Sequence, residues 1–133
     1  MLKPNSFTQG IVGEVTHRIE QSKFKILAMK MFRFNRETAE KFYGEHKGKG
    51  FFEDLIGFMT SGPTVGMILE SENAVVKMRK LVGATNPANA DPGTIRYDYA
   101  PNGFHNVIHA SDSPASVERE MKILFEEKEI VTW

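Results

Sequence analysis

The sequence predicts an α+β fold with a sheet of antiparallel strands covered by helices. The 133 residues suffice for one hydrophobic core, and no repeat, low-complexity tract or linker divides them. We therefore expect residues 1–133 to form a single domain. Apolar periodicity gives the order helix, strand, two helices, strand, helix, strand, helix. With one strand placed first and the helix pair treated as an insertion, the order is the ferredoxin-like βαββαβ plan plus a final helix.

Segments with helical or strand periodicity follow one another along the chain. Helices are indicated where apolar residues recur three and four positions apart, and strands where β-branched and apolar residues run together. The expected elements are a helix over 11–22, a strand over 25–34, helices over 36–46 and 51–59, a strand over 64–69, a helix over 72–82, a strand over 106–110 and a helix that begins at 114.

The segment over residues 25–34 is expected to be a central strand. Its two sides are both largely apolar, as in strands that are buried on both faces. Lys30 is the exception on one side, and we expect it toward an edge of the buried region.

Capping residues mark the starts of three helices. Asn35 and Ser71 are suited to accept hydrogen bonds from the first turns of the helices that follow them. Ser113 is suited to cap the final helix, where Pro114 takes the favoured first position.

The chain begins with Met1-Leu2-Lys3, which leads directly into a Pro-Asn-Ser turn. If a strand precedes that turn, nearly all of it is missing from this sequence. The βαββαβ plan therefore predicts a first strand, at the buried centre of the sheet, that is largely missing here.

Composition and charge exclude several classes of protein. Lys and Arg together number 17, as do Asp and Glu, so the formal net charge of zero gives no case for general binding to nucleic acid or a membrane surface. The absence of Cys excludes disulfides and thiolate metal sites. No apolar run approaches the ~18 residues of a membrane span, and the first residues do not resemble a signal peptide. We expect a cytoplasmic protein.

Common catalytic motifs are absent. The chain has no G-x-x-x-x-G-K-[ST] or G-x-G-x-x-G loop, no H-E-x-x-H and no G-x-S-x-G. His105 and His109 are four positions apart, which on an extended strand separates them by roughly 13 Å. A metal site shared by these two histidines is therefore not expected.

The connection from Gly83 to Phe104 is unusually long for a compact domain. It holds Pro87, Pro92 and Pro101, three of the six prolines. Connections of about 20 residues are often functional. Its portion over residues 94–99 is expected to form one helical turn.

One short segment has the residue types of a reactive site. In Asn106-Val107-Ile108-His109-Ala110-Ser111-Asp112, a histidine precedes a helix start and is flanked by small and hydrogen-bonding residues. Histidine is the side chain most easily used near neutral pH as a base, metal ligand or nucleophile. Taken alone, the segment leaves open whether His109 is structural or catalytic.

The run N-V-I-H-A-S-D-S at residues 106–113 resembles the active-site signature of nucleoside diphosphate kinases, N-x-x-H-[GA]-S-D. The resemblance covers the whole chain. The other matching segments are Lys3-Pro4 (K-P-D in the family), Phe42-Tyr43, Phe51-Phe52, Ser61-Gly62-Pro63 (S-G-P), and Thr85-Asn86-Pro87 with Gly93-Thr94-Ile95-Arg96 (T-N-P…P-G-T-I-R). Asn5 and Tyr97 depart from the usual Asp and Gly, and we expect only local changes there.

The resemblance implies a ping-pong phosphotransfer enzyme. A nucleoside triphosphate gives its γ-phosphate to His109, and a nucleoside diphosphate then takes it from the phosphohistidine. The resemblance implies an orienting carboxylate at Glu120, supported by Ser111, and a contact near the transferred group from Tyr43. It implies phosphate contacts from Lys3, Arg79 and Arg96, and hydrogen bonds to phosphate and sugar from Thr85 and Asn106. It also implies base stacking on Phe51, with Leu55 as a pocket wall.

The resemblance also implies a cofactor and an assembly. Mg²⁺ is expected to arrive with the nucleotide, because no carboxylate cluster resembles a protein cage for it. Asp112 is expected to contribute at most through water. Family members form homo-oligomers, so a hexamer or tetramer is expected.

Two readings without enzymatic activity remain open. The chain could be an inactive relative that serves in regulation or assembly, although its intact His109, Glu120 and Lys3 argue against this. It could instead be an RNA-recognition module, since such modules share the ferredoxin-like plan. The zero net charge and the lack of an aromatic pair on the expected third strand argue against that function.

Overall fold

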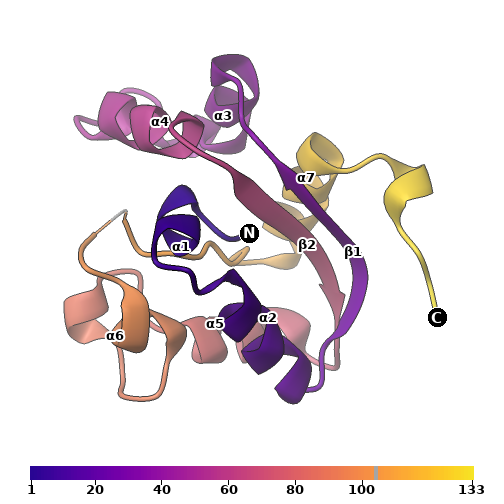
Figure 1. The fold of residues 1–133 in the computed structure, drawn as a ribbon. Helices are drawn as coiled ribbons and strands as arrows, with labels where there is room; N and C mark the ends of the chain where they lie inside the picture. Colours follow the sequence, from indigo (N-terminus) through magenta and orange to yellow (C-terminus); the bar gives the residue numbers. More distant parts are fainter. Residues whose placement is uncertain (104) are drawn as a thin grey trace.

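The computed structural model describes residues 1–103 and 105–133. It has an α+β fold in which helices surround a curved antiparallel sheet (Figure 1). Phe104, the last residue of the long connection predicted from the sequence, lies outside the described residues. The single helical turn predicted within that connection is present as a short helix, Ile95–Tyr99, capped by Thr94.

The sheet has two strands, β1 (Lys25–Phe32) and β2 (Thr64–Glu70), which pair antiparallel. Isolated bridges extend it by joining Leu2 to Val65 of β2 on one side and to Ile108 on the other. The order across the sheet is therefore Ile108, Leu2, β2, β1, as in the ferredoxin-like plan. Leu2, which is 1% exposed, takes the central place.

Helices lie at both ends of the sheet and on both of its faces (Figure 1). None of the described helices has the length and apolarity to cross a membrane. The helices are α1 (Pro4–Thr8), α2 (Val12–Gln21), α3 (Arg36–Phe42), α4 (Phe52–Thr60), α5 (Ala74–Val82), α6 (Ile95–Tyr99) and α7 (Pro114–Leu124), with 3-10 turns η1 (Gly44–His46), η2 (Pro87–Asn89) and η3 (Glu127–Glu129).

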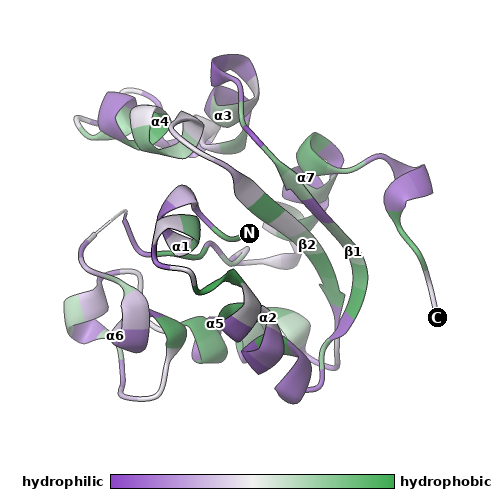
Figure 2. Ribbon diagram, in the orientation of Figure 1, coloured by the Kyte–Doolittle hydropathy of each residue, from purple (hydrophilic) through white to green (hydrophobic). Residues whose placement is uncertain are grey.

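The core consists of apolar clusters that follow these layers. Val15 of α2 and Val65 of β2 belong to a cluster on one face of the sheet, and Ile68 packs with Phe125 on the other face. Alternate residues of a strand point to opposite faces, which is why β2 contributes to both clusters. A further cluster around Phe42 joins α3 to α4. Figure 2 shows hydrophobic residues along β2 and on α5, where these layers meet.

The prediction of a central strand over residues 25–34 is wrong. Within the described part of the chain, β1 pairs only with β2 and so forms an edge. Met29 and Met31 are 45% and 68% exposed, so one apolar side of the strand faces outward. Lys30 does lie at the rim, where its ammonium is 3.0 Å from the carboxylate of Glu129.

The prediction of a strand over residues 106–110 is also wrong. Val107 has φ +62°, and the N–H of Ile108 donates to the carbonyl of Asn106 at 2.8 Å, which closes a three-residue turn. This turn interrupts the extended backbone and leaves only the bridge at Ile108. Here the conformation of the site overrides the strand propensity of the sequence.

Two of the three predicted helix caps are confirmed. Asn35 and Ser113 each accept a hydrogen bond from the backbone N–H three residues further on, and Pro114 is the first residue of α7. The prediction that Ser71 caps a helix is wrong, because α5 begins only at Ala74 and its N-cap is Asn73, which has a left-handed backbone conformation. The helix predicted over residues 36–46 is also shorter and ends as α3 at residue 42, followed by η1.

Candidate active site

The segment between the Val107 turn and α7 holds His109 in a fixed position. Its backbone N–H donates to the carbonyl of Met1 at 2.8 Å, and the terminal amine of Met1 donates to the carbonyl of His109 at 2.9 Å. The imidazole contacts Phe42 edge-on, with ring centroids 5.1 Å apart, and lies 6.3 Å from the ring of Tyr43. These contacts fix both the backbone and the plane of the ring.

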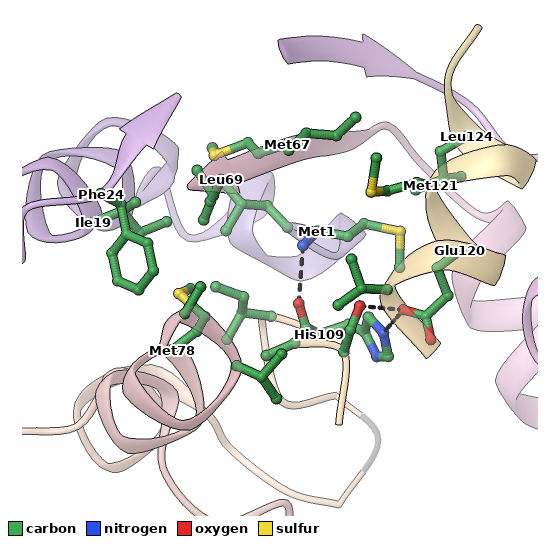
Figure 3. A pocket seen from close by; sticks show the side chains of 18 of the residues that line it. Met1, Ile19, Phe24, Met67, Leu69, Met78, His109, Glu120, Met121 and Leu124 are labelled. Carbon is green, nitrogen blue, oxygen red and sulfur yellow. Dashed lines mark hydrogen bonds and ion pairs between the residues drawn. The ribbon is translucent and has the colours of Figure 1, made fainter. Parts of the chain in front are cut away.

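Glu120 orients the imidazole from the second turn of α7. Its Oε1 is 2.5 Å from Nε2 of His109 and accepts a hydrogen bond from Ser111 Oγ at 2.8 Å (Figure 3). Because a carboxylate only accepts, this contact assigns the proton to Nε2 and leaves the lone pair on Nδ1. The structure thus brings together the three residues that the sequence predicted for this role.

The protonation states suit a nucleophile. Burial lowers the pKa of His109, and the hydrogen bond and charge of Glu120 act in the opposite direction. Burial raises the pKa of Glu120, but hydrogen bonds from His109 and Ser111 outweigh it and hold that pKa below its usual value. At neutral pH the pair is therefore a neutral imidazole beside a carboxylate, and the neutral imidazole is the reactive form.

Lys3 and Asn106 form a buried polar pair. Lys3 Nζ donates to Asn106 Oδ1 at 2.7 Å, and Asn106 Nδ2 donates to the carbonyl of Thr85 at 3.0 Å. Burial, followed by the charge of Arg96, lowers the pKa of Lys3 to about 7. These hydrogen bonds connect three predicted site residues from distant parts of the sequence. Of these three residues, Thr85 is exposed.

Arg96 and Arg79 donate to carbonyls on either side of His109. The guanidinium of Arg96 donates to Ile108 at 2.7 Å, and that of Arg79 donates to Ala110 at 3.1 Å. Burial and the charge of Arg79 lower the pKa of Arg96 to about 10, so Arg96 remains cationic at neutral pH. The two predicted phosphate contacts are therefore positive charges that converge on His109.

Two buried polar atoms at the site have no hydrogen-bond partner in the described part of the chain. They are Nε of Arg96 and the hydroxyl of Tyr43. Burial raises the pKa of Tyr43 well above its usual value, so the hydroxyl keeps its proton. A buried polar group without a partner costs free energy, and a bound ligand would relieve that cost.

A row of aromatic rings connects His109 to Phe51 at the start of α4. The ring of His46 is stacked 6.4 Å from Tyr43 and lies 5.4 Å from Phe51. Phe51 is 41% exposed, whereas Leu55 is buried in the cluster that joins α3 to α4. The structure thus leaves Phe51 partly accessible, with the ammonium of Lys49 5.9 Å from its ring centroid, and buries Leu55.

Sequence reasoning missed His46 and Arg119. His46 follows Tyr43 by three residues, a spacing that places the two rings on one side of a helical turn and could have revealed it. Arg119 donates to the carbonyl of Phe42 at 3.3 Å and lies 3.5 Å from Oε2 of Glu120. Its position directly before Glu120 gave no sign of a contact with α3.

In the part of the chain that the structure describes, no group of three or more His, Asp or Glu side chains could hold a metal ion. Asp112, the predicted water-mediated contributor, is exposed and accepts a hydrogen bond from Ser116 Oγ at 2.6 Å.

The fold and the site define a class of protein. A ferredoxin-like domain holds a carboxylate-oriented histidine nucleophile among Lys and Arg cations, an arrangement suited to phosphoryl transfer through histidine. The family model described as nucleoside diphosphate kinase matches residues 1–130. The chain belongs to the nucleoside diphosphate kinase family.

Similar proteins match this chain along nearly its full length. A nucleoside diphosphate kinase of Listeria monocytogenes serotype 4b (strain CLIP80459) is 51% identical over 133 residues, which is 100% of this chain and 90% of that protein. One from Ignicoccus hospitalis is 53% identical over 131 residues, 98% of this chain and 89% of that protein.

Solved structures of the family have the same fold. A halophilic nucleoside diphosphate kinase from Halobacterium salinarum in complex with CDP has TM-score 0.97 and 39% identity over 99% of this chain and 88% of that chain. An Aquifex aeolicus nucleoside diphosphate kinase has TM-score 0.94 and 39% identity over 98% of this chain and 94% of that chain.

The chain is accordingly a phosphotransferase that moves the γ-phosphate of a nucleoside triphosphate to a nucleoside diphosphate through a phosphohistidine. Members of its family use a divalent metal. Neither the inactive relative nor the RNA-recognition module is favoured.

Proposed function

We propose that Nδ1 of His109 is the atom that carries the phosphoryl group. The observation behind this assignment is the 2.5 Å contact between Nε2 and Glu120, which leaves the lone pair on Nδ1. In the first half-reaction Nδ1 bonds to the γ-phosphorus, and the nucleoside diphosphate leaves with the electron pair of the broken P–O bond. In the second, a terminal oxygen of another diphosphate attacks the phosphorus and Nδ1 leaves.

Glu120 acts by holding the ring and stabilising the charge that the imidazole gains. As Nδ1 forms its bond to phosphorus, the ring becomes cationic, and the carboxylate accepts the hydrogen bond from Nε2–H throughout. Triads with an orienting carboxylate work in the same way. Ser111 fixes the carboxylate by donating to the same oxygen.

The cations around His109 bind the phosphates and stabilise the transferred group. Lys3, Arg79 and Arg96 supply positive charge from three directions, and little else is needed for a transfer that depends on positioning and electrostatics. Asn106 and Thr85 hydrogen-bond to phosphate and sugar. The hydroxyl of Tyr43, which has no hydrogen-bond partner among the described residues, donates to the transferred phosphoryl group.

Phe51 stacks on the base, and Leu55 forms the wall behind it. Stacking uses the face of a base rather than its hydrogen-bonding edge, so it tolerates every base. We therefore expect broad nucleotide specificity. We expect Mg²⁺ as the divalent ion, bound to phosphate oxygens of the incoming nucleotide.

The first test is labelling with γ-³²P-ATP. The wild-type chain is expected to form an acid-labile, base-stable phosphoprotein that any nucleoside diphosphate discharges, because a phosphohistidine has this stability. The variant His109→Ala is expected to take up no label, whereas His17→Ala, at an exposed position on α2, keeps it. Label that persists in His109→Ala would refute the assignment.

We also propose a cytoplasmic homo-oligomer, either a hexamer or a tetramer. The proposal rests on family membership and on the exposed apolar side chains of Met29 and Met31 along the free edge of β1. Large exposed apolar groups on an edge strand are typical of surfaces that another chain covers.

A further inference from the structure

The guanidinium of Arg119 connects the end of α3 to the carboxylate that orients His109. Nη1 donates to the carbonyls of Lys41 and Phe42, each at 3.3 Å, and Nη2 donates to the carbonyl of Phe42 at 3.4 Å. Nη2 also lies 3.5 Å from Oε2 of Glu120. One side chain of α7 therefore contacts both the backbone of α3 and that carboxylate.

The backbone that Arg119 contacts carries two of the rings around the imidazole. Lys41 and Phe42 are the last residues of α3, and the last carbonyls of a helix lack partners within it and favour a nearby cation. The ring of Phe42 contacts His109 edge-on, and Tyr43 is the next residue along the chain. A change at the end of α3 would therefore move both rings relative to the imidazole.

The two oxygens of Glu120 have different partners. Oε1 contacts Nε2 of His109 and accepts from Ser111. Among the described residues, Arg119 is the only partner of Oε2. The last torsion of a glutamate side chain has a broad, roughly two-fold preference, so the partners of the oxygens decide which way the carboxylate faces.

The positive charge of Arg119 makes a smaller contribution to the same carboxylate. Burial raises the pKa of Glu120, while His109, Ser111 and then Arg119 lower it. The side chain of Arg119 is 42% exposed, so solvent screens its charge. Its main effect on the site is therefore geometric.

We propose that Arg119 is a positioning residue for phosphoryl transfer. It holds the carboxylate of Glu120 and the end of α3 in one arrangement, so that the imidazole of His109 and the hydroxyl of Tyr43 face the same phosphorus atom. It acts through these groups without binding the nucleotide. This role depends on the functions proposed above for Glu120 and His109.

The first test compares the rate of transfer with nucleotide affinity in the full chain. Arg119→Met should slow single-turnover phosphorylation of His109 by ATP about threefold to tenfold, less than the loss of Glu120 itself. The Kd for ADP, measured by calorimetry, should change by less than about twofold, because only the transition state loses stabilisation. An unchanged rate, with or without weaker ADP binding, would overturn the role.

Arg33→Met is the matched control for a brace that only stabilises a helix end. Arg33 is exposed and donates at 3.2 Å to the carbonyl of Ser61, the C-cap of α4. Its loss removes the same kind of contact and should leave the phosphorylation rate unchanged. An equal loss of rate in Arg33→Met and Arg119→Met would assign Arg119 to general stability.

A second measurement reads the contact of His109 with Glu120 and needs no activity. In protein labelled with ¹⁵N-histidine, the Nε2 proton should resonate at low field, because it is shared with a carboxylate. In Arg119→Met the resonance should move to higher field or broaden, whereas Arg33→Met should keep it. An unchanged resonance would overturn the role. Arg119→Gln, which also lacks the charge, is the second variant if Arg119→Met fails to fold.

The two measurements separate a failure of this role from a failure of the proposed function. A wild-type chain that takes no label at His109 would refute the proposed function, and the resonance would still test the effect of Arg119 on the pair. A labelled wild-type chain with an equally fast Arg119→Met variant would refute only the role of Arg119.

Discussion

Several residues around His109 are held in states that cost folding free energy. Val107 is β-branched yet has φ +62°, a conformation that costs on the order of 1–3 kcal/mol. Lys3 and Arg96 are cations that are 5% and 3% exposed. In the function proposed above, Lys3 and Arg96 bind and stabilise the reacting charge, which is a reason for such costs to persist at a functional site.

Replacing Glu120→Gln should slow phosphorylation of His109 about tenfold to a hundredfold. A hydrogen bond to a charged group contributes roughly 1.5–3 kcal/mol, and each 1.36 kcal/mol is a factor of ten in rate. Glu120 raises the pKa of His109, so its loss should lower that pKa further and move the acid limb of the pH–rate profile to lower pH. Single-turnover rates from about pH 5 to about pH 8 measure both effects.

Ser111→Ala is the matched control for this prediction. It removes the hydrogen bond to Glu120 but keeps the carboxylate, so the rate should fall less than in Glu120→Gln and the acid limb should shift less. An acid limb that moves to higher pH in Glu120→Gln would contradict the assigned role.

Lys3 should take up a proton when a nucleotide binds above neutral pH. Its pKa is about 7 in the nucleotide-free protein, so it is mostly neutral at about pH 8, and a nearby phosphate raises that pKa. We expect uptake of about one proton per site at about pH 8 and much less at about pH 6. Calorimetric titration in buffers of different ionisation enthalpy measures the uptake.

The variants Lys3→Met and Lys47→Met provide the comparison. Lys3→Met should lose the proton uptake and bind nucleotide more weakly, whereas Lys47→Met changes an exposed lysine and should retain both. Equal uptake at the two pH values in the wild-type chain would show that Lys3 is not the titrating group.

At the scale of elements, capped helices position two residues of the candidate site. Asn35 begins α3, and Tyr43 follows its last residue. Ser113 begins α7, which presents Glu120 to the imidazole on its second turn. The caps therefore determine where two site residues lie as well as how stable the helices are.

Ser113→Ala should lower the free energy of unfolding by about 1 kcal/mol, the usual cost of losing an N-cap. Ser71→Ala should change it by less than about 0.5 kcal/mol, because Ser71 lies before α5 without capping it. Urea denaturation of both variants measures the difference. A larger loss in Ser71→Ala than in Ser113→Ala would contradict the assignment of the caps.

At the scale of the whole molecule, β1 leaves an open apolar edge. The C-terminal residues cover part of it, since the N–H of Val131 donates to Leu27 O at 2.8 Å. Met29 and Met31 remain exposed beside this contact. A monomer with such an edge would tend to associate, and an ordered oligomer buries the same surface specifically.

Met31→Glu should therefore shift the assembly toward smaller species. A charge buried in an apolar interface without a partner is strongly unfavourable. Light scattering coupled to size-exclusion chromatography measures the mass, and the wild-type chain should elute as a tetramer or hexamer. Glu127→Ala, at an exposed position in η3, serves as the control. An unchanged mass in Met31→Glu would place the interface elsewhere.

The sequence by itself predicted the class of fold and the order of most elements, and its resemblance to nucleoside diphosphate kinases supplied the residues of the candidate site. Local rules sufficed for the elements, because periodicity and caps depend on neighbouring residues. The structure alone decided that β1 is an edge, since an apolar strand looks the same whether another element or another chain covers it. It alone also decided the turn at Val107, where contacts with Met1 and Arg96 outweigh strand propensity. Arg119 depends on which distant segments meet, and no local pattern encodes that.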